Sequence, residues 1–373
     1  MKLKYYFKLF FINFLIFLLL FELLSFFLLI QLKISSRPNY TIQSRHHYGD
    51  YNPHFGSWHL PNREIKHTKS CFDVIYKTNS YGAVDINRNI KGKNRTIVIG
   101  DSNVEGFGLD QEKRFSNILE KKLKIPHLNF GTSGHFGTTQ YKLLYEKLAS
   151  KFEHSRVLLF ITVLNDFEDD SFSFGKKVHS DRYRPYLIKS DDKYELTYLN
   201  SFKKDFYIMN EIKNFLNNFT HVYHLLRYLK SLATSEKIIS TNKKTTIDKK
   251  KSSGSRYSYY EVFKNEGLDL MKYNLLAIQQ LVLKNDANLF VILLPMKPDM
   301  EIFIENKKET PRLTRELKEF SKSNKINFID ILLNIDFSKY KTDDLFFACD
   351  SHFNILGNKL VADIIENKIY EKN

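Results

Sequence analysis

The chain opens with a long apolar block and then alternates short apolar runs with segments of helical periodicity. Positions 9–32 are almost continuously Phe, Leu and Ile, which is long enough to cross a bilayer as one helix. Because this block runs straight into polar chain without a small-residue cleavage site, we predict a membrane anchor over residues 1–33. Glu22 and Asn13 interrupt the block, and each is either a contact with another helix or a polar group that its apolar flanks tolerate.

After the anchor, apolar runs and amphipathic stretches follow one another in turn. Strands are predicted at 96–99, 127–130, 157–163, 289–294 and 326–329. Helices are predicted at 114–123, 138–150, 268–282, 314–323 and 355–367. Since strand and helix alternate, the pattern predicts an α/β fold around a parallel sheet, with its two halves at 96–170 and 285–373.

Two segments interrupt this alternation. Residues 34–95 form an irregular lead-in that we expect to pack on the core, with stacking of its aromatic side chains on sugar rings as the alternative. Those aromatic residues are Tyr51, Phe55, Trp58 and Tyr81. Residues 171–284 form an insertion, with a predicted β-hairpin at 184–199, two helical stretches up to about residue 230 and a mobile polar loop at 235–256.

Composition narrows the class of protein. A chain of 373 residues with 43% hydrophobic side chains is able to bury one sizeable core. The formal charge of +15 is spread along the chain without an arginine stripe, so we expect no nucleic-acid partner and only a weak attraction to anionic surfaces. Cys71 and Cys349 are too few for a disulfide scaffold or a cysteine zinc site, and their spacing leaves open whether they pair.

The candidate chemistry begins where the first sheet strand ends, at Gly100-Asp101-Ser102. A serine on such a turn is exposed at the edge of the sheet, where its hydroxyl can meet a substrate and its backbone N–H can face a developing oxyanion. Gly134 follows the second strand and Asn165-Asp166 follows the third, so all three pieces converge at the carboxyl edge of a parallel sheet. A fourth piece, Asp350-Ser351-His352, precedes the last helix and is able to reach the same edge.

This order of blocks resembles the SGNH (GDSL-like) hydrolase family, over residues 96–170 and 288–372. The motifs Asn129-Phe130-Gly131-x-Ser133-Gly134 and Asp350-x-His352-Phe353-Asn354-x-x-Gly357 resemble its membrane-anchored, envelope-facing branch. The short Asp-x-His spacing is similar to that of alginate-acetyltransferase-like members, whereas Asp-x-x-His is the usual form. Val163 and Asn103 also depart from the family pattern, where glycine and leucine are typical. The resemblance implies a three-layer α/β/α sandwich with a flavodoxin-like, five-stranded parallel sheet.

The resemblance also implies a role for each residue. Ser102 would be the nucleophile, His352 the base that takes its proton, and Asp350 the carboxylate that fixes the imidazole, with Asp343 or Asp344 as alternative orienting acids. The oxyanion hole would comprise the Ser102 N–H, the Gly134 N–H and the Asn165 side-chain amide. Gly100, Asp101 and Asp166 would support this site. No spacing of metal ligands stands out, and neither a metal nor a cofactor is predicted.

The expected activity is cleavage of O-acyl esters, O-acetyl above all, on a cell-envelope glycan or related molecule through a serine acyl-enzyme. Two alternatives stay open. With a sugar hydroxyl as acceptor the same residues would give an O-acetyltransferase, which would work with a membrane acyl-transfer partner. The second alternative is a catalytically silent binding module in a polysaccharide export complex, with Glu22 contacting a membrane partner. In each case we expect a single-pass membrane protein whose main domain faces the periplasm or the cell exterior.

Overall fold

The chain comprises two compact units, which are described separately. In the computed structural model, the described residues are 2–31, 48–69, 71–163, 165–191, 193–202, 212, 215–216, 220–226, 229 and 260–371. The first unit combines Met1–His46 with Phe206–Lys250, and the second combines His47–Asp205 with Lys251–Asn373. The predicted mobile loop at 235–256 and most of the two helical stretches before residue 230 lie outside the described residues.

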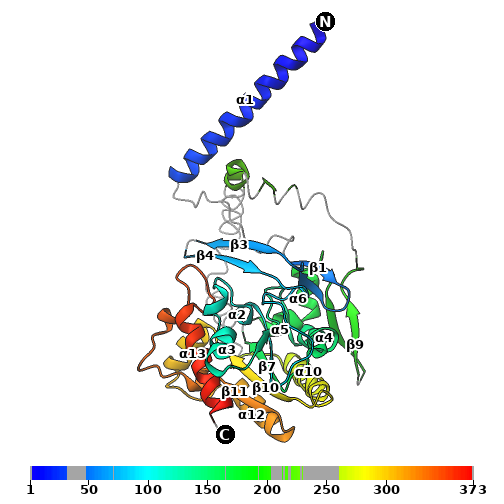
Figure 1. Cartoon of the computed structure of the whole chain (residues 1–373), viewed down its shortest axis with the longest axis vertical. Helices are drawn as coiled ribbons and strands as arrows, with labels where there is room; N and C mark the ends of the chain where they lie inside the picture. Colours follow the sequence, from blue (N-terminus) through cyan, green and yellow to red (C-terminus); the bar gives the residue numbers. More distant parts are fainter. Residues whose placement is uncertain are drawn as a thin grey trace, which may run out of the picture. The chain divides into compact units, whose positions relative to one another are not determined.

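The second unit is built on a parallel sheet of five strands (Figure 1). These strands are β5 (Thr96–Ile99), β6 (His127–Asn129), β7 (Arg156–Thr162), β10 (Asn288–Leu294) and β11 (Asn327–Asp330). Their order across the sheet is β11-β10-β7-β5-β6, and all four neighbouring pairs are parallel. Counted along the chain this is the flavodoxin-like order 2-1-3-4-5, as predicted, and its topological switch point lies between β5 and β7.

Helices cover both faces of this sheet (Figure 1). The larger ones are α3 (Phe115–Leu123), α4 (Thr138–Lys147), α10 (Asn265–Leu283), α11 (Lys297–Glu305), α12 (Arg312–Ser323) and α13 (Ile355–Ile365). On one face α3 packs against α13, and on the other α10 packs against α4. An ion pair between Lys272 of α10 and Glu316 of α12, 3.0 Å long, joins α12 to the second layer. The predicted three-layer sandwich is therefore confirmed.

Burial on both faces of the sheet explains why its inner strands are continuous apolar runs. Every residue of β5 and β6 is buried, and so are the residues of β7 after Arg156. A strand covered on both faces reads as a continuous apolar run rather than as an alternation. The sequence predicted each of these strands to within a residue or two, but it missed α11, which begins at Lys297 directly after β10.

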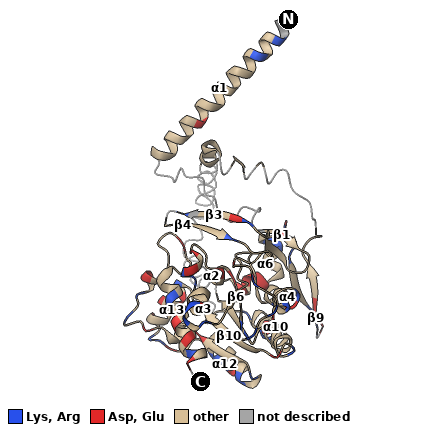
Figure 2. Cartoon of the chain, in the orientation of Figure 1, with Lys and Arg blue, Asp and Glu red and all other residues tan. Residues whose placement is uncertain are grey.

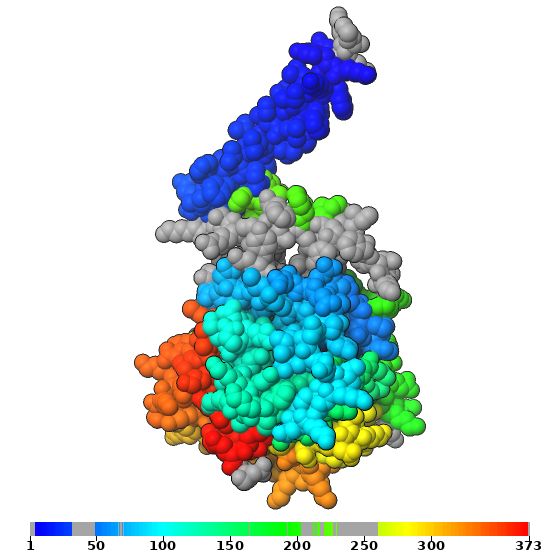
Figure 3. Space-filling model, in the orientation of Figure 1, coloured from blue at the N-terminus to red at the C-terminus, as the bar shows by residue number. Residues whose placement is uncertain are grey.

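The first part of the lead-in is regular, so the prediction of an irregular segment is wrong for residues 48–77. It forms two antiparallel pairs, β1 (Tyr48–Asn52) with β2 (Gly56–His59) and β3 (Glu64–Lys69) with β4 (Phe72–Lys77). The signal for β4 was its alternation of buried and exposed residues, which is the period of a half-buried strand. In the space-filling view, the blue and cyan lead-in spreads over the visible face of this unit (Figure 3).

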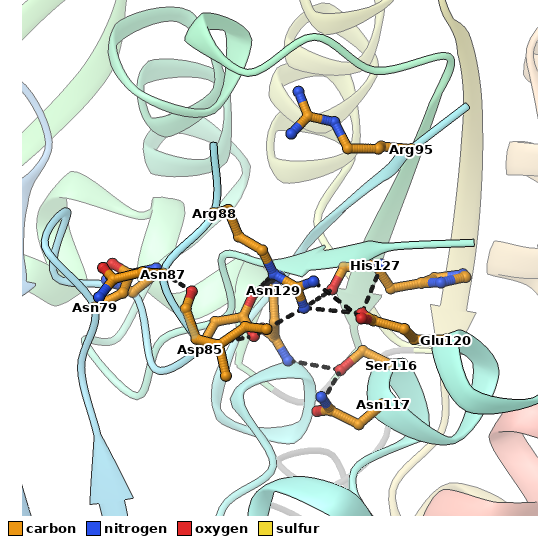
Figure 4. A network of polar contacts seen from close by, with 12 residues as sticks. Asn79, Asp85, Asn87, Arg88, Arg95, Ser116, Asn117, Glu120, His127 and Asn129 are labelled. Atoms are coloured by element: carbon orange, nitrogen blue, oxygen red, sulfur yellow. Dashed lines mark hydrogen bonds and ion pairs between the residues drawn. The ribbon is translucent and has the colours of Figure 1, made fainter. Parts of the chain in front are cut away.

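The lead-in packs on the core as predicted. Phe55 and Trp58 are buried, and the Trp58 indole N–H donates to the Tyr81 carbonyl at 2.8 Å, so neither ring is free to stack on a sugar. A polar network holds its last part (Figure 4). Arg88 bonds both Asp85 and the Glu120 carboxylate of α3, and Glu120 accepts the backbone N–H of His127 at the start of β6. This network connects the last part of the lead-in to β6, the edge strand of the sheet.

Smaller elements complete the second unit. The predicted hairpin is present as β8 (Pro185–Ser190) paired with β9 (Lys193–Tyr198). Three short helices are α2 (Ser102–Glu105), α5 (Asp166–Asp170) and α6 (Phe172–Val178). Among the described residues, Lys and Arg are interspersed with Asp and Glu, and this view shows no stripe of positive charge over them (Figure 2).

The first unit contains the apolar helix α1 (Lys2–Gln31). Its stretch Lys4–Gln31 is long and apolar enough to cross a membrane, since a window of 18 residues within it has a mean hydropathy of 2.5. Glu22, whose role the sequence left open, makes a contact inside this unit. Its carboxylate accepts the backbone N–H groups of His221 and Val222 and faces the His221 imidazole, with Nδ1 2.7 Å from an oxygen. These hydrogen bonds from His221 and Val222 reduce the free-energy cost of placing the Glu22 carboxylate in an apolar helix.

Candidate active site

The turn after β5 places Ser102 at the carboxyl edge of the sheet. Gly100 is required there because a Cβ would lie 2.4 Å from the Val104 side chain. Asp101 is the N-cap of α2, and its carboxylate accepts the Asn103 N–H at 3.0 Å. Ser102 is therefore the first residue of a helix, where backbone N–H groups have no partner within the helix, and its side chain is partly exposed.

The loop before α13 brings His352 to the same edge. Asn354 caps α13 by accepting the N–H groups of Leu356 and Gly357, which explains the Phe-Asn-x-x-Gly end of the motif. The Phe353 N–H lies 3.5 Å from the Asn103 side-chain oxygen of α2. Asn103, which departs from the family pattern, thus connects α2, the helix that begins at Ser102, to the loop that carries His352.

Ser102, His352 and Asp350 form one continuous chain of polar contacts. His352 Nε2 lies 2.7 Å from Ser102 Oγ, and His352 Nδ1 is hydrogen-bonded to Asp350 Oδ1. The Asp350 carboxylate also accepts the backbone N–H of His352 at 3.1 Å. Burial alone would raise the pKa of Asp350, but the hydrogen bond from His352 and the ion pair with Lys69 outweigh it and hold that pKa well below its usual range. The acid is therefore a carboxylate at neutral pH.

The alternative orienting acids lie elsewhere. The Asp343 side chain is 77% exposed and pairs with Lys297 of α11, and Asp344 is exposed. Asp350, in contrast, has a side chain only 8% exposed and touches the imidazole directly. Of the three acids considered, Asp350 is the one in position to fix His352.

The loop after β6 is held against the serine helix by a buried carboxylate. Glu105, fully buried at the end of α2, accepts the backbone N–H of Ser133 at 2.5 Å and its hydroxyl at 2.9 Å. The two backbones are so close that a Cβ on Gly131 would lie 2.2 Å from the Glu105 nitrogen. Gly134 N–H, one of the expected oxyanion donors, donates to Thr132 Oγ1 at 3.2 Å in this structure.

The third strand end supplies Asn165 and a group of buried acids. The Asn165 amide donates to Asp169 at 3.3 Å and also faces Asp101. Asp166 is fully buried, accepts the Thr162 N–H at 3.1 Å and the Tyr141 hydroxyl at 3.1 Å, and has its pKa raised well above the usual value, mainly by burial and then by Asp101. Asp166 therefore has a structural role, because its carboxylate links the end of β7 to the start of α5.

A group of metal-ligating side chains lies beside this strand end. Ligand atoms of His135, Asp169 and His179 are all within 4.8 Å of one another. The Asp169 carboxylate is already engaged, since one oxygen lies 3.3 Å from the Arg184 guanidinium and the other accepts from Asn165. A buried guanidinium next to the cluster opposes a second cation, so we interpret Asp169 as a partner of Arg184 and Asn165 rather than as a metal ligand.

Several residues of the site were not anticipated from the sequence. They are Lys69, which pairs with Asp350; Phe107, whose ring stacks on His352 at 4.1 Å; and Glu105. Cys71 and Cys349, whose pairing the sequence left open, form a disulfide. Lys69 and Cys71 belong to the lead-in, which the family resemblance does not cover. The one available signal was the position of Cys349, directly before Asp350. The apolar helix and the disulfide together indicate a location in the cell envelope.

No protein-family model matches the chain, and no curated protein matches it in sequence. Among solved structures, the chain is similar to a member of the lipolytic G-D-S-L family from Veillonella parvula, with 11% identity over 75% of this chain and 100% of that chain and a TM-score of 0.39. It is also similar to TesA (10% identity, 74% and 98% covered, TM-score 0.38) and to a GDSL-like lipase from Bacteroides thetaiotaomicron (11% identity, 74% and 86% covered, TM-score 0.36). At TM-scores below 0.5, such likeness carries no inference about chemistry, which must come from the site itself.

Proposed function

We propose that this chain is a serine esterase that uses Ser102, His352 and Asp350. The observation that carries the proposal is the continuous contact from the Ser102 hydroxyl through both imidazole nitrogens to a carboxylate. A serine hydroxyl is a poor nucleophile at neutral pH and needs an adjacent base that a third group orients. Here the base is within hydrogen-bond distance and the third group is ionised.

The reaction would proceed in two halves. His352 takes the Ser102 proton while Oγ attacks the ester carbonyl carbon, and the resulting oxyanion is bound by backbone and amide N–H groups. His352 then gives the proton to the departing alkoxide, which leaves an acyl group on Ser102. In the second half water, or an acceptor hydroxyl, loses a proton to His352 and attacks the acyl carbon. The bond between the acyl carbon and Ser102 Oγ then breaks, and His352 returns the proton to Oγ.

Binding of the oxyanion is proposed to use the Ser102 N–H together with Gly134 and Asn165. The Gly134 N–H bonds a neutral hydroxyl, Thr132 Oγ1, at 3.2 Å, and a charged oxygen is the stronger acceptor. The Asn165 amide would have to exchange its bonds to Asp169, 3.3 Å long, and to Asp101 for one to the oxyanion. A Cβ on Gly134 would lie 2.8 Å from the Ser57 hydroxyl, which keeps this position as glycine. The three proposed donors come from the loops that follow β5, β6 and β7.

The proposed substrate is an O-acyl ester, with O-acetyl on an envelope glycan as the first choice. Support comes from α1, which is long enough for a single-pass anchor, and from the disulfide, which is stable in an oxidising compartment. We therefore place the second unit on the periplasmic or outer side of the membrane, as in the anchored branch of SGNH hydrolases. Protease digestion of intact and lysed cells tests this orientation, and protection of this unit in lysed cells with sealed inner membranes would contradict it.

The acceptor decides between hydrolase and transferase. The test is release of p-nitrophenol from p-nitrophenyl acetate by the full chain in detergent, with and without an envelope glycan. Release that is unchanged by the glycan supports the esterase, whereas faster release with acetyl transfer to the glycan shows an O-acetyltransferase that uses the same residues. Absence of serine-dependent release, together with absence of fluorophosphonate labelling, would leave the silent binding module.

A further inference from the structure

The β3–β4 hairpin of the lead-in reaches the acid of the site. Asp350 uses both carboxylate oxygens: Oδ1 bonds His352, and Oδ2 forms an ion pair with Lys69 at the end of β3. The Lys69 side chain is 28% exposed and the Asp350 side chain 8% exposed, so this pair is partly shielded from water. Lys69 Nζ also lies 5.0 Å from the centre of the Phe107 ring, which stacks on the His352 imidazole.

A covalent link stands beside the ion pair. Cys71 and Cys349 form a disulfide, and their Cα atoms are 5.8 Å apart. Along the chain Cys71 is two residues after Lys69, and Cys349 directly precedes Asp350. Aromatic packing of Phe72 on Phe347, with ring centres 5.1 Å apart, adds a third contact between the hairpin and the histidine loop. Salt bridge, disulfide and ring contact thus fix the same short stretch of loop.

We propose that Lys69 is a positioning residue of this active site and that the Cys71–Cys349 disulfide holds it against Asp350. Lys69 does not touch the reacting atoms; it acts through Asp350, whose second oxygen it fixes so that the first stays aimed at His352 Nδ1. This assignment rests on the proposed serine chemistry. It makes the lead-in part of the catalytic apparatus, rather than only a strap that covers the core.

The electrostatic consequence can be measured. The charged and titratable groups that face His352 are Asp350 on its own loop, Lys69 and His67 on β3, and Asp101 before α2. A cation near an imidazole disfavours its protonated form, and a general base must be neutral. Removing the Lys69 cation is therefore expected to move the acidic limb of kcat/KM upward, by about half a pH unit for a charge at this range.

The test compares Lys69→Met, Lys69→Arg and wild type as full chains in detergent. For Lys69→Met we expect kcat to fall about 10-fold, because the carboxylate is less well oriented, together with the upward shift of the acidic limb. Lys69→Arg keeps a cation and is expected to keep the limb at its wild-type position. Lys77→Met is the matched control, since Lys77 lies on the same hairpin, pairs with Glu64 and is 65% exposed; its profile should equal that of wild type.

The disulfide is tested with the double variant Cys71→Ser/Cys349→Ser, which leaves no free thiol. We expect the limb to move in the same direction as in Lys69→Met, and adding Lys69→Met to the double variant should change it little further. If the double variant does not fold, the Lys69 variants decide alone. A Lys69→Met profile that coincides with wild type overturns the proposal.

A readout that does not depend on turnover separates this proposal from the proposed function. The His352 titration can be followed by NMR with labelled histidine and assigned with His352→Gln. A higher midpoint in Lys69→Met supports the role of Lys69 even if the chain proves to be no esterase. An unchanged midpoint in a chain whose turnover does require Ser102 overturns the role of Lys69 and leaves the esterase in place.

Discussion

His352 Nε2 lies 2.7 Å from the hydroxyl oxygen of Ser102, although 250 residues separate the two in the chain. The fold makes this contact by bringing the end of β5 and the loop before α13 to one edge of a parallel sheet. The edge lies at the switch point between β5 and β7, where ligand sites of such sheets occur. The predictions below follow from this contact and from the residues that support it.

Asp350→Asn should reduce kcat by about 10³–10⁴-fold, because an amide cannot hold His352 in the tautomer that accepts the Ser102 proton. The melting temperature should change only slightly, because Lys69, which loses its charged partner, is still partly exposed to water. Steady-state kinetics with p-nitrophenyl acetate measures the effect. Asp343→Asn is the control, because Asp343 is an exposed acid of the same region that pairs with Lys297. Loss of activity in Asp343→Asn with normal activity in Asp350→Asn would refute the assignment.

Asn165→Ala should reduce kcat by about 10²–10³-fold with little change in KM, since the amide is proposed to bind charge that exists only in the transition state. In the present structure this amide faces Asp169 and Asp101, so its contribution requires exchange of those bonds. The rate of fluorophosphonate labelling should fall together with kcat. A variant with wild-type kcat would remove Asn165 from the oxyanion hole.

His67→Phe should reduce the loss of stability at acid pH. His67 is fully buried among Phe72, Tyr76 and Phe107, and neither of its ring nitrogens has a partner among the described residues. Burial lowers its pKa to about 4, against 6.5 in the unfolded chain. The unfolded state therefore binds more protons between pH 6.5 and 4, and stability falls as the pH falls through this window, by about 1–3 kcal/mol in total.

The readout is the difference in melting temperature between pH 7.5 and pH 5.0. It should be smaller in His67→Phe than in wild type, and any packing strain from the phenyl ring would affect both pH values alike. His54→Phe serves as the control, because His54 is an exposed histidine of the same lead-in. An equal pH difference in His67→Phe and wild type would show that His67 is not the group that titrates.

Local patterns were enough to predict the sheet and to bring the candidate residues to one edge of it. The strands read as buried apolar runs, and Ser102, Asn165 and the Asp350-x-His352 piece each stand at the end of an element, where polar residues face solvent and substrate. A parallel sheet then brings its strand ends together without any further information. The order of the pieces therefore predicted where the candidate residues lie, but it did not predict their side-chain contacts.

The remaining features depend on contacts between distant segments, which no local pattern encodes. The Cys71–Cys349 pair spans 278 residues, and the Lys69–Asp350 pair joins a hairpin to a loop at the other end of the chain. The sequence predicts an irregular lead-in because strands of only four to six residues give too short a pattern to recognise. Likewise, the bond from Gly134 to Thr132 depends on the exact path of the loop that Glu105 holds.

The central claim, that Ser102 is a nucleophile, is tested most directly by fluorophosphonate labelling of the full chain beside Ser102→Ala, with p-nitrophenyl acetate turnover and melting measured on the same samples. We predict labelling of wild type on Ser102, no labelling of Ser102→Ala, loss of its turnover by at least about 10³-fold, and a nearly unchanged melting temperature. Labelling or turnover that persists in Ser102→Ala would contradict the account. A large drop in its melting temperature would instead show that Ser102 supports the fold.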